Sequence, residues 1–111
     1  MEITIDTSGA FAVARLKGEF GMYDGEKVSE QLQPLVAEPD SRLAVTLDEV
    51  TFINSDGLNA LIAANTRARL GRSRMVLVAP SSFVKGVLEV TQLDQWFDIC
   101  DDLDQAAERL S

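Results

Sequence analysis

The chain has 111 residues, a formal net charge of −8 and 46% hydrophobic residues. This length suits one hydrophobic core, so we expect a single domain over residues 1–111. The acidic balance argues against nucleic acid and anionic lipid surfaces as ligands. No apolar stretch approaches the roughly 18 residues that cross a bilayer, and the first residues lack a signal-peptide pattern. We therefore expect a cytoplasmic protein without membrane insertion.

The residue types that most catalytic and metal sites need are scarce. There is no histidine and Cys100 is the single cysteine, which removes the commonest general base and a zinc site of the Cys/His kind. Neither a Walker-type loop nor a dinucleotide fingerprint occurs. Acidic pairs such as Asp48-Glu49 lack calcium-loop spacing. We therefore expect no enzyme activity, no catalytic residues, no bound metal and no cofactor.

Alternating apolar residues predict two strands at the start of the chain, over residues 2–6 and 10–17, joined by a hairpin turn. Residues 18–25 are expected to form a loop. Asp24 is a candidate N-cap for the helix that follows, and Pro34 should distort that helix or end it. The apolar positions of the helix share one face and are Val28, Leu32, Leu35 and Val36.

The next part of the chain alternates between strands and helices. Residues 43–47 and 75–79 are short apolar runs typical of central strands covered on both faces. Each run precedes a segment rich in capping residues, at 54–57 and at 80–82, and a helix with one apolar face.

A weak strand at 96–99 and a last amphipathic helix complete the pattern, and Asp102 with Gln105 resembles a capping box for that helix. Strands that alternate with helices imply right-handed crossovers onto a largely parallel sheet. The sequence therefore predicts an α/β fold, with a mixed sheet of four to five strands and about four helices.

Several segments in this order resemble the STAS domain of bacterial anti-sigma factor antagonists. Residues 18–20 are similar to the family's Gly-Glu-Leu-Asp turn. Residues 50–58 read Val-Thr-Phe-Ile-Asn-Ser-Asp-Gly-Leu and resemble its signature, an apolar stretch followed by Asp-Ser-Ser-Gly-Leu. The segment from Ala79-Pro80 to Trp96-Phe97 resembles the family's last third. The resemblance covers nearly the whole chain and implies the STAS fold and a regulatory binding module.

The resemblance also implies a phosphorylation switch. In the antagonists, the anti-sigma factor is a serine kinase that phosphorylates the residue just before the signature glycine, and the unphosphorylated antagonist captures the anti-sigma factor. That residue is Asp56 in this chain. Asn54 replaces the signature's leading aspartate, and Gly21 replaces the aspartate that closes the first turn. These departures leave the expected fold unchanged and argue against phosphorylation at residue 56.

Three interpretations of Asp56 stay open on the sequence alone. Its charge at the start of a helix, beside free N–H groups, could imitate a phosphoserine in part and keep the surface permanently in the non-binding state. The charge could instead contact a basic partner directly. Alternatively, Asp56 is only the N-cap of that helix, a role worth about 1 kcal/mol. Ser55 is the remaining hydroxyl of the loop, and it is either an alternative phosphoacceptor or the N-cap itself.

The expected partner surface combines this loop with the segment after the second predicted strand. The loop residues are Asn54, Ser55, Asp56, Gly57 and Leu58. Phe20, Met22 and Tyr23 either extend the surface as an apolar docking patch or close the end of the sheet as core residues.

The expected partner is an anti-sigma factor or a related serine kinase or scaffold, and homodimerisation stays open. An alternative hypothesis is a cytoplasmic STAS accessory subunit of an ABC-type lipid-transport complex, because those subunits also carry a signature loop that docks on a partner.

Overall fold

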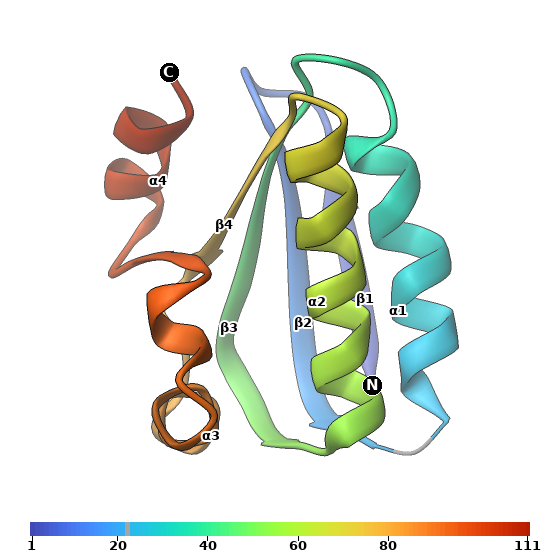
Figure 1. The fold of residues 1–111 in the computed structure, drawn as a ribbon, viewed down its shortest axis with the longest axis vertical. Coiled ribbons are helices and arrows are strands. Elements are labelled where there is room, and N and C mark those ends of the chain that lie inside the picture. Colours follow the sequence, from blue (N-terminus) through green and yellow to red (C-terminus); the bar gives the residue numbers. More distant parts are fainter. Residues whose placement is uncertain (22) are drawn as a thin grey trace.

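The fold is built around one mixed β-sheet (Figure 1). The computed structural model describes residues 1–21 and 23–111. The strands lie in the order β1-β2-β3-β4-β5; β1 and β2 are antiparallel, and the other neighbours are parallel. This confirms the predicted mixed sheet. The strands are β1 (Glu2–Asp6), β2 (Ala12–Phe20), β3 (Arg42–Ile53), β4 (Arg74–Val78) and β5 (Asp98–Cys100).

Helices pack on both faces of the sheet. α1 and α2 lie side by side on one face, and α4 lies on the other face, over β3 and β4 (Figure 1). α3 packs against β3, beyond the edge of α2 (Figure 1). The helices are α1 (Asp24–Leu32), α2 (Ser55–Leu70), α3 (Ser82–Val90) and α4 (Leu103–Leu110). Short 3-10 segments cover Gln33–Val36 and Leu93–Gln95.

The core consists of two apolar clusters, one on each face of the sheet. β3 contributes to both: Leu43 and Val45 belong to the cluster beneath α1, α2 and α3, while Ala44 belongs to the cluster beneath α4. Because both faces of this strand are covered, its sequence shows a continuous apolar run rather than an alternation. The smaller cluster consists of Ala44, Val76, Val78, Cys100, Ala106 and Leu110.

The second strand is longer than the sequence suggested. β2 continues to Phe20, so the expected loop over residues 18–25 is wrong for its first part. β3 runs to Ile53 and keeps β2 paired through two register shifts, between Arg15 and Lys17 and between Gly18 and Glu19. Gly18 has a φ of 105°, which glycine adopts without a steric cost, so a residue typical of loops stands inside a bulged strand.

The ends of the helices differ in how well the sequence predicted them. Asp24 is the first residue of α1 and not its N-cap; its carboxylate accepts a hydrogen bond from the Gly21 N–H at 2.8 Å. Pro34 lies in the 3-10 segment after α1, which confirms the predicted distortion. The Asp102 carboxylate caps α4 by accepting from the Gln105 N–H at 2.8 Å.

The last strand is β5 at residues 98–100 rather than at 96–99, because a 3-10 turn precedes it.

Among the described residues, no helix combines the length and the apolar character that a bilayer crossing requires.

Candidate functional site

The signature loop is a tight connection between the end of β3 and the start of α2. Asn54 is the N-cap of α2, and its side-chain oxygen accepts from the Gly57 N–H at 3.0 Å. The Asn54 carbonyl accepts from the Leu58 N–H at 2.9 Å, and the Asn54 N–H donates to the Phe20 carbonyl at 3.2 Å. The backbone of residue 54 is thus tied both to the helix and to the end of β2.

This geometry corrects the interpretation of Asp56 and Ser55 as helix caps. Ser55 and Asp56 are the first and second residues of α2, and both are exposed. Asparagine caps helices about as well as serine or aspartate, and the extended backbone of Asn54 (φ −105°, ψ −173°) has the form of an N-cap. Capping preference alone could have nominated Asn54, but it could not choose among three adjacent capping residues.

A buried aromatic ring supports the loop from below. A Cβ atom added at Gly57 would lie 2.6 Å from Phe20 Cδ1 and 2.9 Å from Ile53 Cγ1, so only glycine fits there. Phe20 itself is fully buried. The expectation of Phe20 as part of an exposed docking patch is therefore wrong, and its alternative role as a core residue that closes the end of the sheet is correct.

The first turns of α1 and α2 touch each other. A Cβ atom at Gly25 would lie 2.8 Å from the Asp56 carbonyl oxygen, so the two backbones are in contact. Beside this contact is a hollow of about 440 Å³. Its lining residues are Tyr23, Gly25, Glu26, Ser29, Asp56, Asn59, Ala60 and Ala63. Tyr23 is 87% exposed and lies beside the loop as expected, whereas Met22 lies outside the described residues.

Asp56 presents its charge outward at this hollow. Among the described residues, its carboxylate takes part in no hydrogen bond and no ion pair. Asn54 already bonds the Gly57 N–H, so the α2 cap does not need the aspartate. Glu26 lines the same hollow and adds to its negative potential. The site can therefore offer a carboxylate to a cationic group from outside.

Asp6 and Cys100, in β1 and β5, have pKa values that depart from their ordinary values. Hydrogen bonds from Ser8 lower the pKa of Asp6, at the end of β1. Burial raises the pKa of the Cys100 thiol in β5. Within residues 1–21 and 23–111, no group of three or more Cys, Asp or Glu side chains is placed to hold a metal ion.

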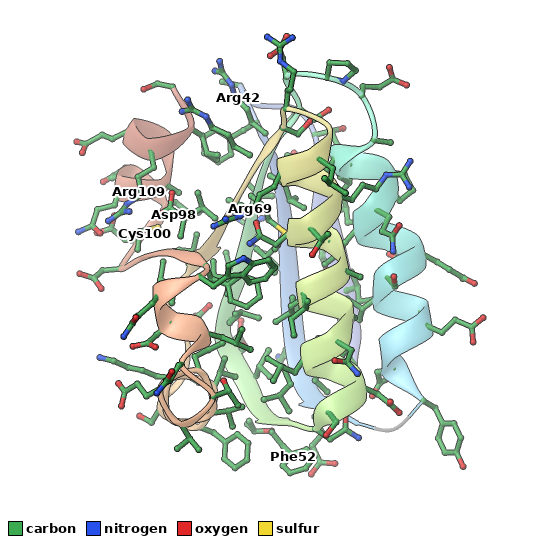
Figure 2. All side chains as sticks on the ribbon, in the orientation of Figure 1. Arg42, Phe52, Arg69, Asp98, Cys100 and Arg109 are labelled. Carbon is green, nitrogen blue, oxygen red and sulfur yellow. The ribbon has the colours of Figure 1, made fainter. Side chains whose placement is uncertain are left out.

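The helix predicted after residues 80–82 is α3, but its attachment beside the loop was not predicted from the sequence. Ser81, the N-cap of α3, donates its N–H to the Leu47 carbonyl at 3.2 Å and its hydroxyl to the Val50 carbonyl at 2.5 Å. These bonds fix α3 to the irregular part of β3 and bring Phe83 beside Phe52, with ring centroids 5.2 Å apart. Figure 2 shows Phe52 at the end of the molecule where β3 leads into α2. The sequence signal for this pair is limited to the apolar character of residues 52 and 83.

Residues 2–106 match the family model of the STAS domain, and the chain belongs to this family. An anti-sigma factor antagonist from Mycobacterium paratuberculosis superposes with a TM-score of 0.85 at 23% identity, covering 98% of this chain and 92% of that one. An anti-sigma-factor antagonist (STAS) domain protein from Planctomyces limnophilus gives a TM-score of 0.82 at 15% identity, covering 97% of each chain.

The phosphorylated form of the Bacillus cell fate determinant SpoIIAA gives a TM-score of 0.73 at 16% identity, covering 99% of this chain and 100% of that one. At these identities the structural likenesses show a shared fold. Together with the family match, they confirm the resemblance to STAS domains that residues 18–20 and 50–58 indicated.

Proposed function

We propose that this STAS domain is a regulatory binding module without enzyme activity, and that it binds an anti-sigma factor of the serine-kinase type, or a related scaffold, through the loop at 54–58. The observation that carries the proposal is the exposed carboxylate of Asp56, held at the start of α2 without a partner among the described residues. A charged group at a fixed position, on a STAS domain that shares its fold with anti-sigma factor antagonists, suits recognition of another protein.

The residue before the signature glycine decides how such a module is regulated. SpoIIAA, which has this fold, has been solved in an unphosphorylated and in a phosphorylated form. In this chain the equivalent position carries Asp56, and a carboxylate cannot accept phosphate from a serine kinase in the manner of a hydroxyl. Its charge is permanent, whereas a phosphoserine carries about −1.5 to −2 only while it is modified. Residue 56 is therefore locked in one charge state.

The permanent charge promotes binding in this proposal. Asp56 is turned neither toward the α2 cap nor toward an internal cation, so it keeps its full capacity for an arginine or lysine of the partner. Glu26 and the exposed Tyr23 line the same hollow and offer that cation a second carboxylate and an aromatic ring. This module would act in the bacterial cytoplasm as a binder that its partner cannot switch off at residue 56.

Isothermal titration calorimetry tests the proposal with purified candidates from the same genome. The candidates are the anti-sigma factors of the serine-kinase type and the ATPase subunit of any ABC lipid transporter. Binding to an anti-sigma factor supports the proposal. Binding to the ATPase alone contradicts it and favours the accessory-subunit function.

A phosphorylation assay tests the fixed charge state of residue 56. We expect the wild-type chain, incubated with the partner kinase and ATP, to carry no phosphate at residue 56. Any phosphate on the loop should lie on Ser55, which is exposed, and should be absent from Ser55→Ala. The matched variant Asp56→Ser should become phosphorylated at residue 56. Mass spectrometry of the peptide that contains the loop separates these results.

A further inference from the structure

α3 carries two apolar stripes: one is buried in the core, and the other is partly exposed, although its Val87 packs against the core. Val84 and Leu88 are buried against the sheet. A second stripe at i, i+3, i+4 and i+7 consists of Phe83, Gly86, Val87 and Val90. Phe83 is 44% exposed and Val90 is 86% exposed. A helix at the surface of a domain normally has polar residues on its outer side, so this second stripe needs a separate explanation.

Phe52 joins this stripe to the signature loop. Its ring is 40% exposed and packs in a tilted arrangement against Phe83. Phe52 also lies two residues before Asn54, at the end of β3 (Figure 2). We call the combined surface the α3 patch, defined by Phe52, Phe83, Gly86, Val87 and Val90. The patch and the loop are therefore neighbouring parts of one end of the molecule.

The position of the patch relative to the loop is fixed rather than adjustable. The two hydrogen bonds of Ser81 to the carbonyls of Leu47 and Val50 attach α3 to the same strand that ends at the loop. At Gly86 an added Cβ would meet no atom within 4 Å, so another chain can approach the helix backbone closely. A partner that reaches both parts meets one continuous surface with an apolar and an anionic half.

The charges near the patch are mostly acidic, although Lys17 on β2 and Lys85 on α3 are exposed cations, and this balance indicates what covers the patch. Glu19, Asp48, Glu49 and Asp56 are exposed on the adjoining ends of β2 and β3 and on the first turn of α2. Among the described residues, only Glu49 of these four has an ion-pair partner, the Lys17 ammonium at 3.7 Å. A second copy of the chain would bring a second set of these carboxylates, and nucleic acid or an anionic membrane would be repelled. A basic protein surface complements them.

We infer that the α3 patch is the second half of the partner-binding surface. Apolar side chains of the partner cover Phe83 and Val90, while basic side chains next to them meet Asp56 and the neighbouring carboxylates. The inference rests on the proposed function, because the partner is the protein that docks on the loop at 54–58. It deepens that function by assigning apolar contact area to α3, outside the signature loop.

The test measures affinity for the anti-sigma factor that binds the wild-type chain, with two single variants in the patch and one control. We expect Phe83→Ser to weaken binding about tenfold or more, and Val90→Ser several-fold, since exposed apolar anchors become buried at such interfaces. Leu70→Ser is the matched control because Leu70 is 83% exposed at the far end of α2 and outside the patch. Its affinity should equal that of wild type.

Val90→Ser keeps the test independent of folding, because Val90 makes little contact with the core. Equal affinities for wild type, Phe83→Ser and Val90→Ser would overturn this inference and leave the proposed function intact. Failure of wild type to bind any anti-sigma factor would overturn the proposed function and this inference with it. A wild-type dimer in sedimentation velocity that Phe83→Ser converts to a monomer would assign the patch to a second copy and also overturn the inference.

Discussion

The base and the rim of the signature loop are adjacent in sequence but obey different constraints. At the base, Gly57 lies against the buried Phe20 ring, and Asn54 bonds both α2 and the end of β2. At the rim, Ser55 and Asp56 are exposed, and the Asp56 carboxylate has no partner among the described residues. The fold therefore determines the residues at the base, whereas the residues at the rim are free to be chosen for a binding partner.

The largest expected effect is at the base. Phe20→Ala should lower the free energy of unfolding by about 3–5 kcal/mol, because it removes a fully buried ring and leaves a cavity under α2. Urea denaturation followed by circular dichroism measures the change. A loss below about 1 kcal/mol would show that the loop does not depend on this ring.

Gly57 provides a sharper comparison because α3 contains a matched glycine. Gly57→Ala should destabilise the protein by about 1–3 kcal/mol, since its methyl group would overlap the Phe20 ring and the Ile53 side chain. Gly86→Ala should stabilise it by about 0.5–1 kcal/mol, because the added methyl group meets open space and alanine favours helix. Thermal unfolding gives both changes, and the same sign for the two variants would contradict the packing described.

The third prediction concerns the identity of the α2 cap. Asn54→Ala should cost about 1 kcal/mol, because the Gly57 N–H loses its acceptor. Asn59→Ala, in an exposed position on the same helix, should change the stability by about 0.5 kcal/mol or less. If urea denaturation showed a larger loss of unfolding free energy for Asp56→Ala than for Asn54→Ala, Asp56 rather than Asn54 would be the residue that caps α2.

At the rim, replacement of Asp56 should barely affect the fold. Asp56→Ser removes a favourable interaction with the α2 dipole, which is worth roughly 0.3–1 kcal/mol. The midpoint of thermal unfolding should therefore fall by no more than a few degrees. A much larger fall would mean that the carboxylate is part of the structural base.

Local signals explain which parts of this fold the sequence could predict. Apolar runs mark the strands at 43–47 and 75–79, Asp102 is recognisable as a cap, and residues 80–82 are recognisable as the start of a helix, because each signal depends on its immediate neighbours. The extension of β2 to Phe20 depends on pairing with the distant end of β3, so a glycine inside the strand suggested a loop instead.

The candidate site shows the same limit. Its location at residues 54–58 followed from the family signature. The choice of Asn54 as the cap required the backbone angles, because three adjacent residues all cap helices well. The contact of Phe52 with Phe83 joins two segments that come together only through the hydrogen bonds of Ser81 to β3, and no local pattern reports it.

The central claim is that Asp56 offers a permanent charge to a basic partner. Calorimetry with the anti-sigma factor that binds the wild-type chain tests it most directly, with Asp56→Ser and the isosteric Asp56→Asn as variants. Both should weaken binding, by about 1–3 kcal/mol, as for the loss of a charge-assisted hydrogen bond. The difference from wild type should shrink at high salt. Equal or tighter binding by Asp56→Ser would contradict the claim, and tighter binding would show that Asp56 imitates an inhibitory phosphate.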